Sequence, residues 1–557
     1  MTDPKPPEME APQSGVKVRM YRVGGLGDCF LLAFRTRARR ARYMLIDCGV
    51  FLGTKDGSKR LQAVARDIQA ATGGRIHVLV ATHEHWDHLS GFQYARKIFD
   101  QIEVDEAWLA WTESPGHPLA EQMRKRREIT LRALDTALHQ LQSLHHPLAG
   151  RIEGILSFHD FLAADTKLKG SAGLIQYPQQ KAKVTRYLTP KQPPLTWSDV
   201  QGVRIFVLGP PEDEKLLTRS DPSGLEGEVY ERPESLNTAA AFYASVLAGD
   251  DPSRLSPAEE DIFKRSLPFD RVHGIRIQEA SRHPDYGLFF QQHYGFAQGP
   301  EGDQGSGSDP APAGDPASGG GPAPAGDPGS EGAQGPGGDP ISQGPEWRRI
   351  DMDWWGQVEN LALHLDRDTN NTSLALAIEL PGGKVLLFPG DAQVGNWHSW
   401  HDLSWPDEKG EPVTPAQLLQ RTVLYKVGHH GSHNATLRDK GLELMTRPDL
   451  VAMIPVSKDA AEQRGWAMPF PSLQARLKEK TRGRILYSDP SLPPVEEAVT
   501  PEGWDIANCC VNVDPSDENL WVELVIETRE SQETPPPVEK VTPPRRTPPL
   551  TKRHTPE

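Results

Sequence analysis

Short apolar runs separated by polar loops mark the first part of the chain. Apolar runs of about four to eight residues between turn residues are typical of buried strands. The pattern therefore predicts strands over residues 17–21, 30–34, 43–46 and 76–80. A helix is expected over residues 60–71, between the third and the fourth strand. This order of elements indicates a mixed α/β fold.

Helical spacing returns after the fourth strand. We expect a helix over residues 91–99, and one long amphipathic helix or two over residues 118–145. The longer segment is predicted to lie outside the part of the fold that carries the candidate metal ligands. The region from about 212 to 296 has a weaker pattern. It is either an insertion that covers a site and sets substrate choice or an elaboration of the scaffold.

The second half of the chain again combines strands with helices. Apolar periodicity predicts a helix over residues 354–365, and a Pro-Gly-Gly turn joins strands 373–379 and 384–388 into a hairpin. A further strand begins at Val423, and the last is expected over residues 522–526. The whole pattern suggests two β-sheets packed face to face, with helices on the outside.

The candidate chemistry is concentrated directly after the strand at residues 76–80. The run His83-Glu-His85-Trp-Asp87-His88 places three histidines and an aspartate in six positions of one loop. A loop that leaves a strand end can direct His83 and His85 toward one cation while Asp87 and His88 face a second. Most histidines are structural, but this density of ligand-type side chains favours a metal site.

Two later strands also end in residues that bind metals. The strand at 384–388 is followed by a Gly-Asp pair that ends at Asp391, and the strand from Val423 is followed by His429 and His430. At a strand end, the carboxylate of Asp391 could bridge two cations. One histidine of the pair is a candidate ligand, and the other could face substrate or protonate a leaving group. The residues alone do not distinguish the two histidines.

This combination resembles the metallo-β-lactamase superfamily and, within it, a stand-alone soluble form of the ComEC-like branch, named for the hydrolase part of the DNA-uptake competence protein. The resemblance extends over residues 16–92, 202–211 and 370–489. Seven family-type segments occur in the order that the family implies, at residues 23–32, 45–49, 83–88, 203–210, 370–373, 390–391 and 429–432. The resemblance implies an αββα sandwich whose metal-binding loops meet at one edge.

The resemblance also implies a dinuclear site with bridging hydroxide as nucleophile, with Zn²⁺ expected and Mn²⁺ or Fe as alternatives. His83 and His85 would hold one cation, and Asp391 would bridge to the second. Asp87, His88 and one histidine of the later pair would hold that second cation. The full set of expected ligands is His83, His85, Asp87, His88, Asp391, His429 and His430. The residues expected to act in catalysis are Asp87, Asp391, His429 and His430.

The sequence departs from the superfamily pattern at one expected ligand, and it leaves the roles of two aspartates open. Many members carry a further histidine ligand before the bridging aspartate, but residues 208–210 contain none. The first cation would then have three protein ligands, be weakly held, or be completed by His429 or His430. Asp28 and Asp47 are expected either to orient ligand histidines by accepting their other N–H or to belong to turns.

Composition indicates that part of the chain lies outside any packed core. Of 557 residues, 51 are proline and 50 are glycine, and the hydrophobic fraction is 37%. A disordered linker is expected where small, polar and proline residues dominate. The predicted organisation is a disordered N-terminus (1–15), the first half of a metallo-β-lactamase domain with an insertion from about 212 (16–297), the linker (298–345), the second half-domain (346–530) and a disordered proline-rich tail (531–557).

The opening residues lack the apolar core of a secretory signal, and no stretch of about 18 apolar residues occurs. We therefore expect a cytoplasmic protein that does not act at a membrane. The four cysteines agree with this expectation. Cys29 and Cys48 lie in apolar strand contexts, and Cys509 and Cys510 are adjacent, so reduced thiols are expected.

Three functions remain open from the sequence. The first is a phosphodiesterase or nuclease acting on DNA or RNA, because ComEC-like proteins are associated with DNA degradation and a dinuclear site suits phosphodiester hydrolysis. The second is hydrolysis of a small ester, thioester or lactam in a narrower pocket. The third is a regulatory protein with a structural metal site, whose proline-rich tail recruits a protein partner.

Two basic clusters bear on the nucleic-acid hypothesis. One is an arginine-rich hairpin turn and the other is a basic stretch of helix. The candidate phosphate contacts are Arg37, Arg39, Arg40, Arg124, Arg126 and Arg127. The formal net charge of −15 at pH 7 opposes binding of nucleic acid by the molecule as a whole. Charged runs are more often solvated surface, so the clusters do not decide between the three functions.

Overall fold

The computed structural model describes residues 8–143, 148–159, 171–219, 354–407, 410–464, 466, 468–489, 491–492 and 509–528. The predicted linker, the predicted tail and nearly all of the 212–296 segment lie outside these residues. Contacts divide the chain into two units, of which the first comprises Met1–Lys125, Gly154–Arg232 and Leu365–Glu557. Both sheets and all the candidate ligands belong to this first unit.

The first sheet has eight strands in the order β14-β15-β1-β2-β3-β4-β5-β6. The strands are β1 (Val16–Tyr21), β2 (Phe30–Arg35), β3 (Ala41–Ile46), β4 (Arg75–Val80), β5 (Glu103–Ala110), β6 (Ala182–Leu188), β14 (Cys509–Val513) and β15 (Trp521–Ile526). Pairing is antiparallel from β14 to β3 and parallel from β3 to β6. Strands β1 to β4 and β15 match the strands predicted from the sequence.

The second sheet has seven strands in the order β13-β12-β11-β10-β9-β8-β7. The strands are β7 (Leu195–Thr196), β8 (Arg204–Gly209), β9 (Ala375–Glu379), β10 (Val385–Phe388), β11 (Thr422–Lys426), β12 (Val451–Ile454) and β13 (Ile485–Tyr487). Pairing is parallel from β13 to β10 and antiparallel from β10 to β7. The predicted hairpin is β9–β10, so both sheets combine a parallel part with an antiparallel part.

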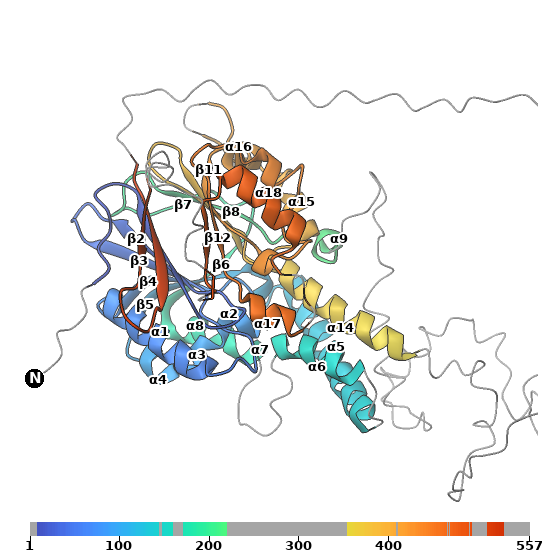
Figure 1. The fold of residues 1–557 in the computed structure, drawn as a ribbon. Coiled ribbons are helices and arrows are strands. Elements are labelled where there is room, and N and C mark those ends of the chain that lie inside the picture. Colours follow the sequence, from blue (N-terminus) through green and yellow to red (C-terminus); the bar gives the residue numbers. More distant parts are fainter. Residues whose placement is uncertain are drawn as a thin grey trace, which may run out of the picture. The chain divides into compact units, whose positions relative to one another are not determined.

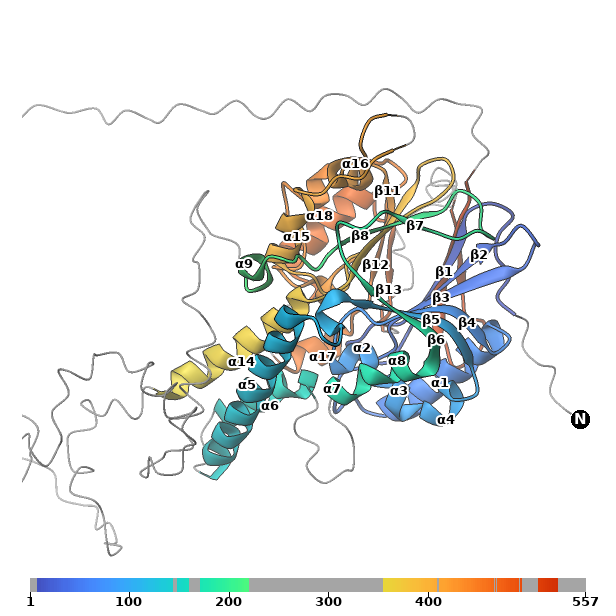
Figure 2. The ribbon, with the colours of Figure 1, turned by 180° about the vertical axis from the view of Figure 1, so that it is seen from behind.

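The two sheets face each other across one apolar core. Val18 and Phe30 of the first sheet belong to the same buried cluster as Leu386 and Val451 of the second. Separate buried clusters lie between each sheet and its helices. Figures 1 and 2 show α1 (Gly57–Ala71), α3 (Gly91–Tyr94) and α4 (Arg96–Phe99) outside the first sheet, and α15 (Val394–Trp400), α16 (Pro415–Gln420) and α18 (Pro471–Thr481) outside the second. The expected αββα arrangement is therefore confirmed.

Some elements differ from the sequence prediction. The helix expected over residues 91–99 is divided into α3 and α4 at Ala95, whose backbone (φ −111°, ψ 23°) is not helical. The helix expected over residues 354–365 continues to Asn371. The strands that were not predicted include β6, which lies at an edge of its sheet. Most of its side chains are at least partly exposed, so β6 lacks the apolar run by which buried strands are recognised.

The remaining helices are α2 (Trp86–Leu89), α5 (Pro118–Ser143), α6 (Leu148–Leu156), α7 (Ser171–Leu174), α8 (Gln176–Lys181), α9 (Glu214–Leu217), α14 (Trp354–Asn371) and α17 (Lys458–Glu462), with 3₁₀ turns η1 (Trp111–Glu113), η2 (Ser157–His159), η8 (His429–Gly431) and η9 (Leu442–Leu444). The described part of the second unit consists of segments of α5, α6 and α14. Among the helices that the structure describes, none is both long and apolar enough to cross a membrane.

A histidine in β4, away from the candidate ligands, makes the stability of the first unit depend on pH. The Nδ1 atom of His77 accepts a hydrogen bond from the Tyr43 backbone N–H at 3.1 Å. Burial, together with the nearby Arg42, lowers the pKa of His77 to about 4. As the pH falls, His77 of the unfolded chain is therefore protonated near its ordinary pKa of about 6.5, whereas His77 of the folded chain is protonated only near pH 4. The contribution of neutral His77 to stability is complete above about pH 6.5 and is lost as the pH falls toward 4.

We expect the stability advantage of the wild-type chain over His77→Gln to shrink as the pH falls from about 7 to about 5. Glutamine can accept the same hydrogen bond from Tyr43 but does not titrate. Urea unfolding of both proteins across this range measures the difference. His139→Gln, which changes an exposed histidine of α5, should show the pH dependence of the wild type. If the free energies of unfolding of the wild type and of His77→Gln differed by the same amount at every pH, His77 would not be the source of this pH dependence.

Candidate metal centre

The candidate ligands follow the carboxyl ends of parallel strands in both sheets. In the first sheet, Asp47 follows β3, and the segment 83–88, here called the ligand loop, comes after β4. The sequence predicted a loop throughout this segment, but Asp87 and His88 lie in the short helix α2. In the second sheet, Asp391 comes after β10, and the pair His429 and His430 comes after β11. Parallel neighbours end at the same edge of a sheet, so each sheet brings its ligands to one edge. The αββα sandwich thereby joins segments that lie far apart in the sequence.

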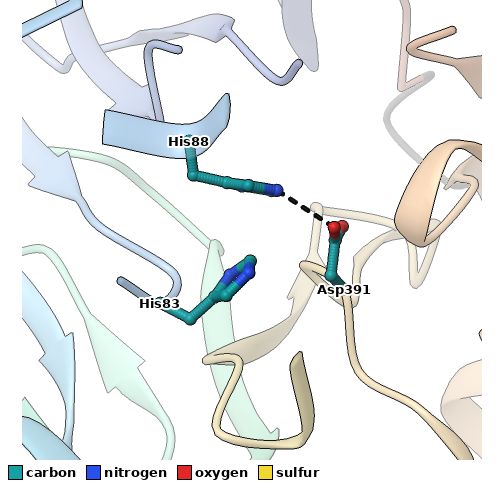
Figure 3. Close-up of side chains that lie close together, drawn as sticks. All are labelled: His83, His88 and Asp391. Atoms are coloured by element: carbon teal, nitrogen blue, oxygen red, sulfur yellow. Dashed lines mark hydrogen bonds and ion pairs between the residues drawn. The ribbon is translucent and has the colours of Figure 1, made fainter. Parts of the chain in front are cut away.

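Within the described residues, four groups of histidines and aspartates offer ligand atoms that all lie within 4.8 Å of one another. The groups are His83, His88 and Asp391; Asp87, Asp391 and His430; Asp28, Asp47 and His88; and His85, His159 and Asp366. Figure 3 shows the first group, in which Asp391 faces the two imidazoles of the β4 loop. Asp391 also belongs to the second group, so its carboxylate lies where it could contact two cations.

Both oxygens of Asp391 are engaged. Its Oδ2 lies 3.1 Å from His88 Nε2, and its Oδ1 accepts hydrogen bonds from Lys426 Nζ at 3.1 Å and from the His429 backbone N–H at 3.0 Å. The Lys426 ammonium also forms an ion pair with Asp28 and is fully buried. Lys426 was not among the residues expected from the sequence. The available signal was a charged residue at the end of an otherwise apolar strand that leads into the histidine pair.

The two adjacent histidines have different surroundings. His430 Nε2 lies 2.9 Å from Asp87 Oδ2, and His430 Nδ1 lies 2.6 Å from the Pro455 carbonyl oxygen. His429 Nδ1 lies 3.1 Å from Ser432 Oγ, and His429 belongs to none of the four groups. Both histidines have left-handed backbone, with φ 44° for His429 and 53° for His430. The structure therefore places the imidazole of His430, rather than that of His429, among the candidate ligands.

Asp47 and Asp28 lie behind the ligands. Asp47 accepts hydrogen bonds from the Thr82 backbone N–H at 2.8 Å and from the Thr82 hydroxyl at 2.7 Å, and its Oδ2 lies 2.8 Å from His88 Nδ1. The Asp28 backbone N–H donates to the Asp87 carbonyl oxygen at 3.1 Å. Asp47 thus contacts a candidate ligand through its side chain. Asp28 holds the ligand loop through its backbone, and its Oδ2 lies 3.9 Å from His88 Nδ1.

The charges enclosed in the site shift several pKa values. Burial, and then the neighbouring imidazoles, lower the pKa of His83 and of His85, so both rings are neutral and can offer a lone pair. Burial opposes protonation of His88 as well, but the surrounding aspartates outweigh it and raise the pKa of His88 well above its ordinary value. Burial favours the neutral acid at Asp391, but His88 and Lys426 outweigh it and hold the Asp391 pKa well below its ordinary value.

His85 has neighbours that were not expected from the sequence. Its Nδ1 lies 3.0 Å from His83 Nε2, and its Nε2 lies 3.7 Å from Asp366 Oδ1. The ring of His159 meets the ring of His85 edge to face, with centroids 4.8 Å apart. Burial, and then the charge of Asp87, raise the pKa of Asp366 to about 8. His159 ends η2 and Asp366 lies in α14, and neither segment has metal-ligand spacing in the sequence.

The donor set fits divalent cations. Imidazole nitrogens and carboxylate oxygens are the ligands that zinc and similar ions take from proteins. Two buried atoms of the centre, Asp87 Oδ1 and Asp28 Oδ1, form no hydrogen bond with the described residues. Buried polar atoms without partners cost free energy, and a cation within reach would remove that cost. The residues present are therefore suited to hold metal ions.

Gly49 allows the segment that follows β3 to pack closely against the ligand loop. A Cβ atom added to Gly49 would lie 2.4 Å from the carbonyl carbon and oxygen of Asp87 and 2.5 Å from the backbone nitrogen of His88. The Cys48 backbone N–H donates to the His88 carbonyl oxygen at 2.8 Å and holds the two segments together. Because backbone atoms would obstruct the added carbon, any side chain at this position must displace Asp87 and His88.

We expect Gly49→Ala to weaken cation binding about 10- to 100-fold, the range found when the support of metal ligands is disturbed. Competition with a chromophoric chelator measures the affinity. Gly154→Ala is the matched control, because no atom lies within 4 Å of a Cβ added to Gly154 in α6. Equal affinities of the two variants would contradict the role assigned to the close packing at Gly49.

The two basic clusters differ in their exposure. The exposed arginines of the β2–β3 turn include Arg37, Arg39 and Arg40. Strand β3 runs from this turn to Asp47, so its six residues, at about 3.3 Å each, place the turn about 20 Å from Asp47. In α5, Arg124 donates to two backbone carbonyls near η1, Arg126 is half-buried and Arg127 is buried. Their contact with nucleic acid stays a prediction.

Comparison with known families matches residues 23–129 to the family described as Metallo-beta-lactamase superfamily. The matched segment contains Asp28, Asp47 and the ligand loop at 83–88, whereas Asp391 and His430 lie beyond it. No curated protein and no solved structure gave a significant match. The family match and the two-sheet arrangement agree with the metallo-β-lactamase fold, and the match supports a metal-dependent hydrolase in general.

Proposed function

We propose that this chain is a dinuclear, metal-dependent phosphodiesterase of the ComEC-like type that cleaves DNA or RNA. The observation that carries the proposal is the position of Asp391. Its carboxylate belongs both to the group with His83 and His88 and to the group with Asp87 and His430. A carboxylate shared by two sets of ligands suits two cations at close spacing, which is the arrangement that stabilises attacking and leaving oxygens in phosphoryl transfer.

The residues that would hold the cations are His83, His85, Asp87, His88, Asp391 and His430. When bound there, two divalent cations lower the pKa of a water molecule and neutralise the charge that develops at the reacting phosphorus. Zn²⁺ is the cation proposed, because imidazole and carboxylate ligands suit it, and Mn²⁺ and Fe take the same ligand types.

Other residues of the chain would orient the ligands. Asp47 can accept a hydrogen bond from the Nδ1–H of His88, and the Pro455 carbonyl oxygen can accept one from the Nδ1–H of His430, so each ring presents Nε2 to the centre. Lys426 donates to Asp391 Oδ1, which holds the carboxylate with Oδ2 toward His88. These contacts set the geometry before substrate binds, and pre-set geometry lowers the barrier for attack.

His429 is the residue proposed to move a proton. Its backbone N–H donates to Asp391, which fixes it beside the centre, but its imidazole is outside the groups of candidate ligands. Burial lowers the pKa of His429 to about 4, so the ring is neutral at pH 7. A neutral imidazole can first accept a proton and then pass it to the leaving oxygen.

The position of the arginine-rich turn supports a second candidate, the hydrolysis of a small ester. The turn lies about 20 Å from Asp47 along β3. A substrate that contacts both the turn and the cations must therefore be a polymer, whereas a small ester needs only the metal centre. The formal charge of −15 further reduces the general attraction for nucleic acid.

A cleavage assay tests these functions. Protein reconstituted with zinc or manganese is incubated with plasmid, single-stranded DNA, RNA and bis(p-nitrophenyl) phosphate, alongside the double variant Asp87→Ala/His88→Ala. His433→Ala is the control, because His433 is exposed and lies outside the candidate groups. Cleavage of nucleic acid by the wild type and the control alone supports the proposal. Turnover of the chromogenic ester alone supports the second candidate, and bound metal with neither activity contradicts both.

A further inference from the structure

The two ring nitrogens of His85 have different surroundings. Its Nδ1 lies 3.0 Å from His83 Nε2. Two nitrogens that bind one tetrahedral zinc ion at about 2.0–2.1 Å lie about 3.3 Å apart, so this pair is spaced for a shared cation. His83 Nδ1 lies 3.1 Å from Thr82 Oγ1 and 3.2 Å from Ser373 Oγ, which leaves His83 Nε2 for that cation. His83 would thus bind through Nε2 and His85 through Nδ1.

The Nε2 atom of His85 lies on the other side of its ring. The two nitrogens of an imidazole point in nearly opposite directions, so Nε2 is directed away from a cation bound at Nδ1. It is buried and forms no hydrogen bond with the residues that the structure describes. A neutral imidazole that binds a cation through Nδ1 carries its proton on Nε2 and is a donor there. Because a buried donor without an acceptor costs free energy, this mode of binding calls for an acceptor beside Nε2.

Asp366 offers such an acceptor. Its Oδ1 lies 3.7 Å from His85 Nε2 and, within the described part of the chain, is buried without a hydrogen bond. Its Oδ2 accepts a hydrogen bond from Asn370 Nδ2 at 3.2 Å, which orients the carboxyl group. A hydrogen bond between nitrogen and oxygen spans about 2.7–3.2 Å, so a shift of about 0.5–1 Å would form one at Oδ1. A carboxyl oxygen accepts in either protonation state, so this contact does not depend on the charge of Asp366.

Asp366 occupies a core-facing position of α14. Its neighbours Leu365 and Thr369 are buried as well, and such positions of an amphipathic helix usually carry apolar residues. The buried ring of His159 meets the ring of His85 edge to face, with centroids 4.8 Å apart, and the ligand-type atoms of these two histidines and Asp366 lie within 4.8 Å of one another. A carboxyl group in such surroundings is costly, and a donor from His85 would offset part of that cost.

We propose that Asp366 positions His85 by accepting a hydrogen bond from its Nε2–H, so that Nδ1 faces the cation shared with His83. The inference rests on the proposed dinuclear function and adds a residue that acts through a ligand without binding the cation itself. Acceptors of this kind fix the tautomer and the orientation of a ligand histidine and raise its basicity. Asp366 lies outside the residues 23–129 that match the superfamily.

Zinc affinity tests the proposal without reference to catalysis. Asp366→Leu removes both carboxyl oxygens, whereas Asp366→Asn keeps one acceptor oxygen. Competition with a chromophoric chelator should show one zinc ion bound about 10- to 100-fold more weakly by Asp366→Leu and a smaller loss in Asp366→Asn. Asp402→Leu changes an exposed aspartate after α15 and should bind zinc like the wild type. Wild-type affinity in Asp366→Leu, or equal losses in the two Asp366 variants, would overturn the proposal.

The stability of the metal-free protein separates positioning from a merely structural role. Without a cation, Asp366 Oδ1 is a buried oxygen that forms no hydrogen bond with the described residues, so a neutral side chain of the same size should not destabilise the fold. We expect Asp366→Asn to unfold in urea and chelator at the wild-type midpoint or above it. A clear fall of this midpoint would assign Asp366 to packing and contradict the positioning role.

A zinc-loaded crystal of the wild type decides the question if Asp366→Leu does not fold. Zinc about 2.0–2.1 Å from His85 Nδ1, with Nε2 about 2.7–3.2 Å from Asp366 Oδ1, supports the proposal. Zinc at His85 Nε2, or a gap to Asp366 that stays beyond hydrogen-bond distance, overturns it and leaves the proposed function standing. A wild-type chain that binds no cation contradicts both.

Discussion

Asp391→Ala is expected to abolish turnover and to reduce bound metal below two equivalents. The variant removes the one carboxylate that belongs to both the His83, His88 group and the Asp87, His430 group. Cations in such sites stabilise transition-state charge by several kcal/mol, so a loss of about a thousandfold or more in kcat is expected. Turnover of the preferred substrate and elemental analysis of the dialysed protein measure the two effects.

The control for this variant is Asp402→Ala. Asp402 is exposed, follows α15 and belongs to none of the candidate groups. It should retain activity and metal content. If Asp391→Ala kept full activity and two bound metal ions per chain, the dinuclear scheme would be contradicted. If the variant lost activity but kept both metal ions, Asp391 would be needed for the reaction but not for holding a cation.

Lys426→Met is expected to lower the unfolding free energy of the metal-free protein by about 3–5 kcal/mol. Lys426 is 1% exposed and pairs with both Asp28 and Asp391, and methionine keeps a similar volume without the charge. Breaking a buried ion pair from one side leaves uncompensated buried charge, for which costs of this size are typical. Urea unfolding in the presence of a chelator measures the change, because bound cations would otherwise replace the missing positive charge.

Two comparisons make the Lys426 prediction specific. Lys384→Met removes an ion pair of 3.5 Å with Asp449, a carboxylate that still accepts two hydrogen bonds from Arg447, so a change of about 1 kcal/mol or less is expected. The double variant Asp28→Asn/Lys426→Met should recover part of the lost stability, because one of the two uncompensated carboxylates is then neutral. A Lys426→Met protein within about 1 kcal/mol of the wild type would contradict the charge balance described for the centre.

The sequence by itself determined the frame of the fold and the identity of most candidate ligands. Buried strands such as β4 and β10 are continuous apolar runs, so their positions depend on local composition. The loop at 83–88 carries its ligand-type side chains within six consecutive positions, and such a density is visible without knowledge of the fold. The edge strand β6, with partly exposed and charged residues, lacks this local signal.

Only the tertiary structure decided which side chains meet. His429 and His430 are adjacent and chemically identical in the sequence, but in the structure His430 Nε2 lies 2.9 Å from Asp87 Oδ2, whereas His429 Nδ1 lies 3.1 Å from Ser432 Oγ. Lys426 and Asp366 are candidates only because packing buries them beside other charged groups. Sequence periodicity reports which face of an element is buried. It does not report which buried polar groups from distant segments are brought within reach of one another, because that depends on how the two sheets and their connections pack.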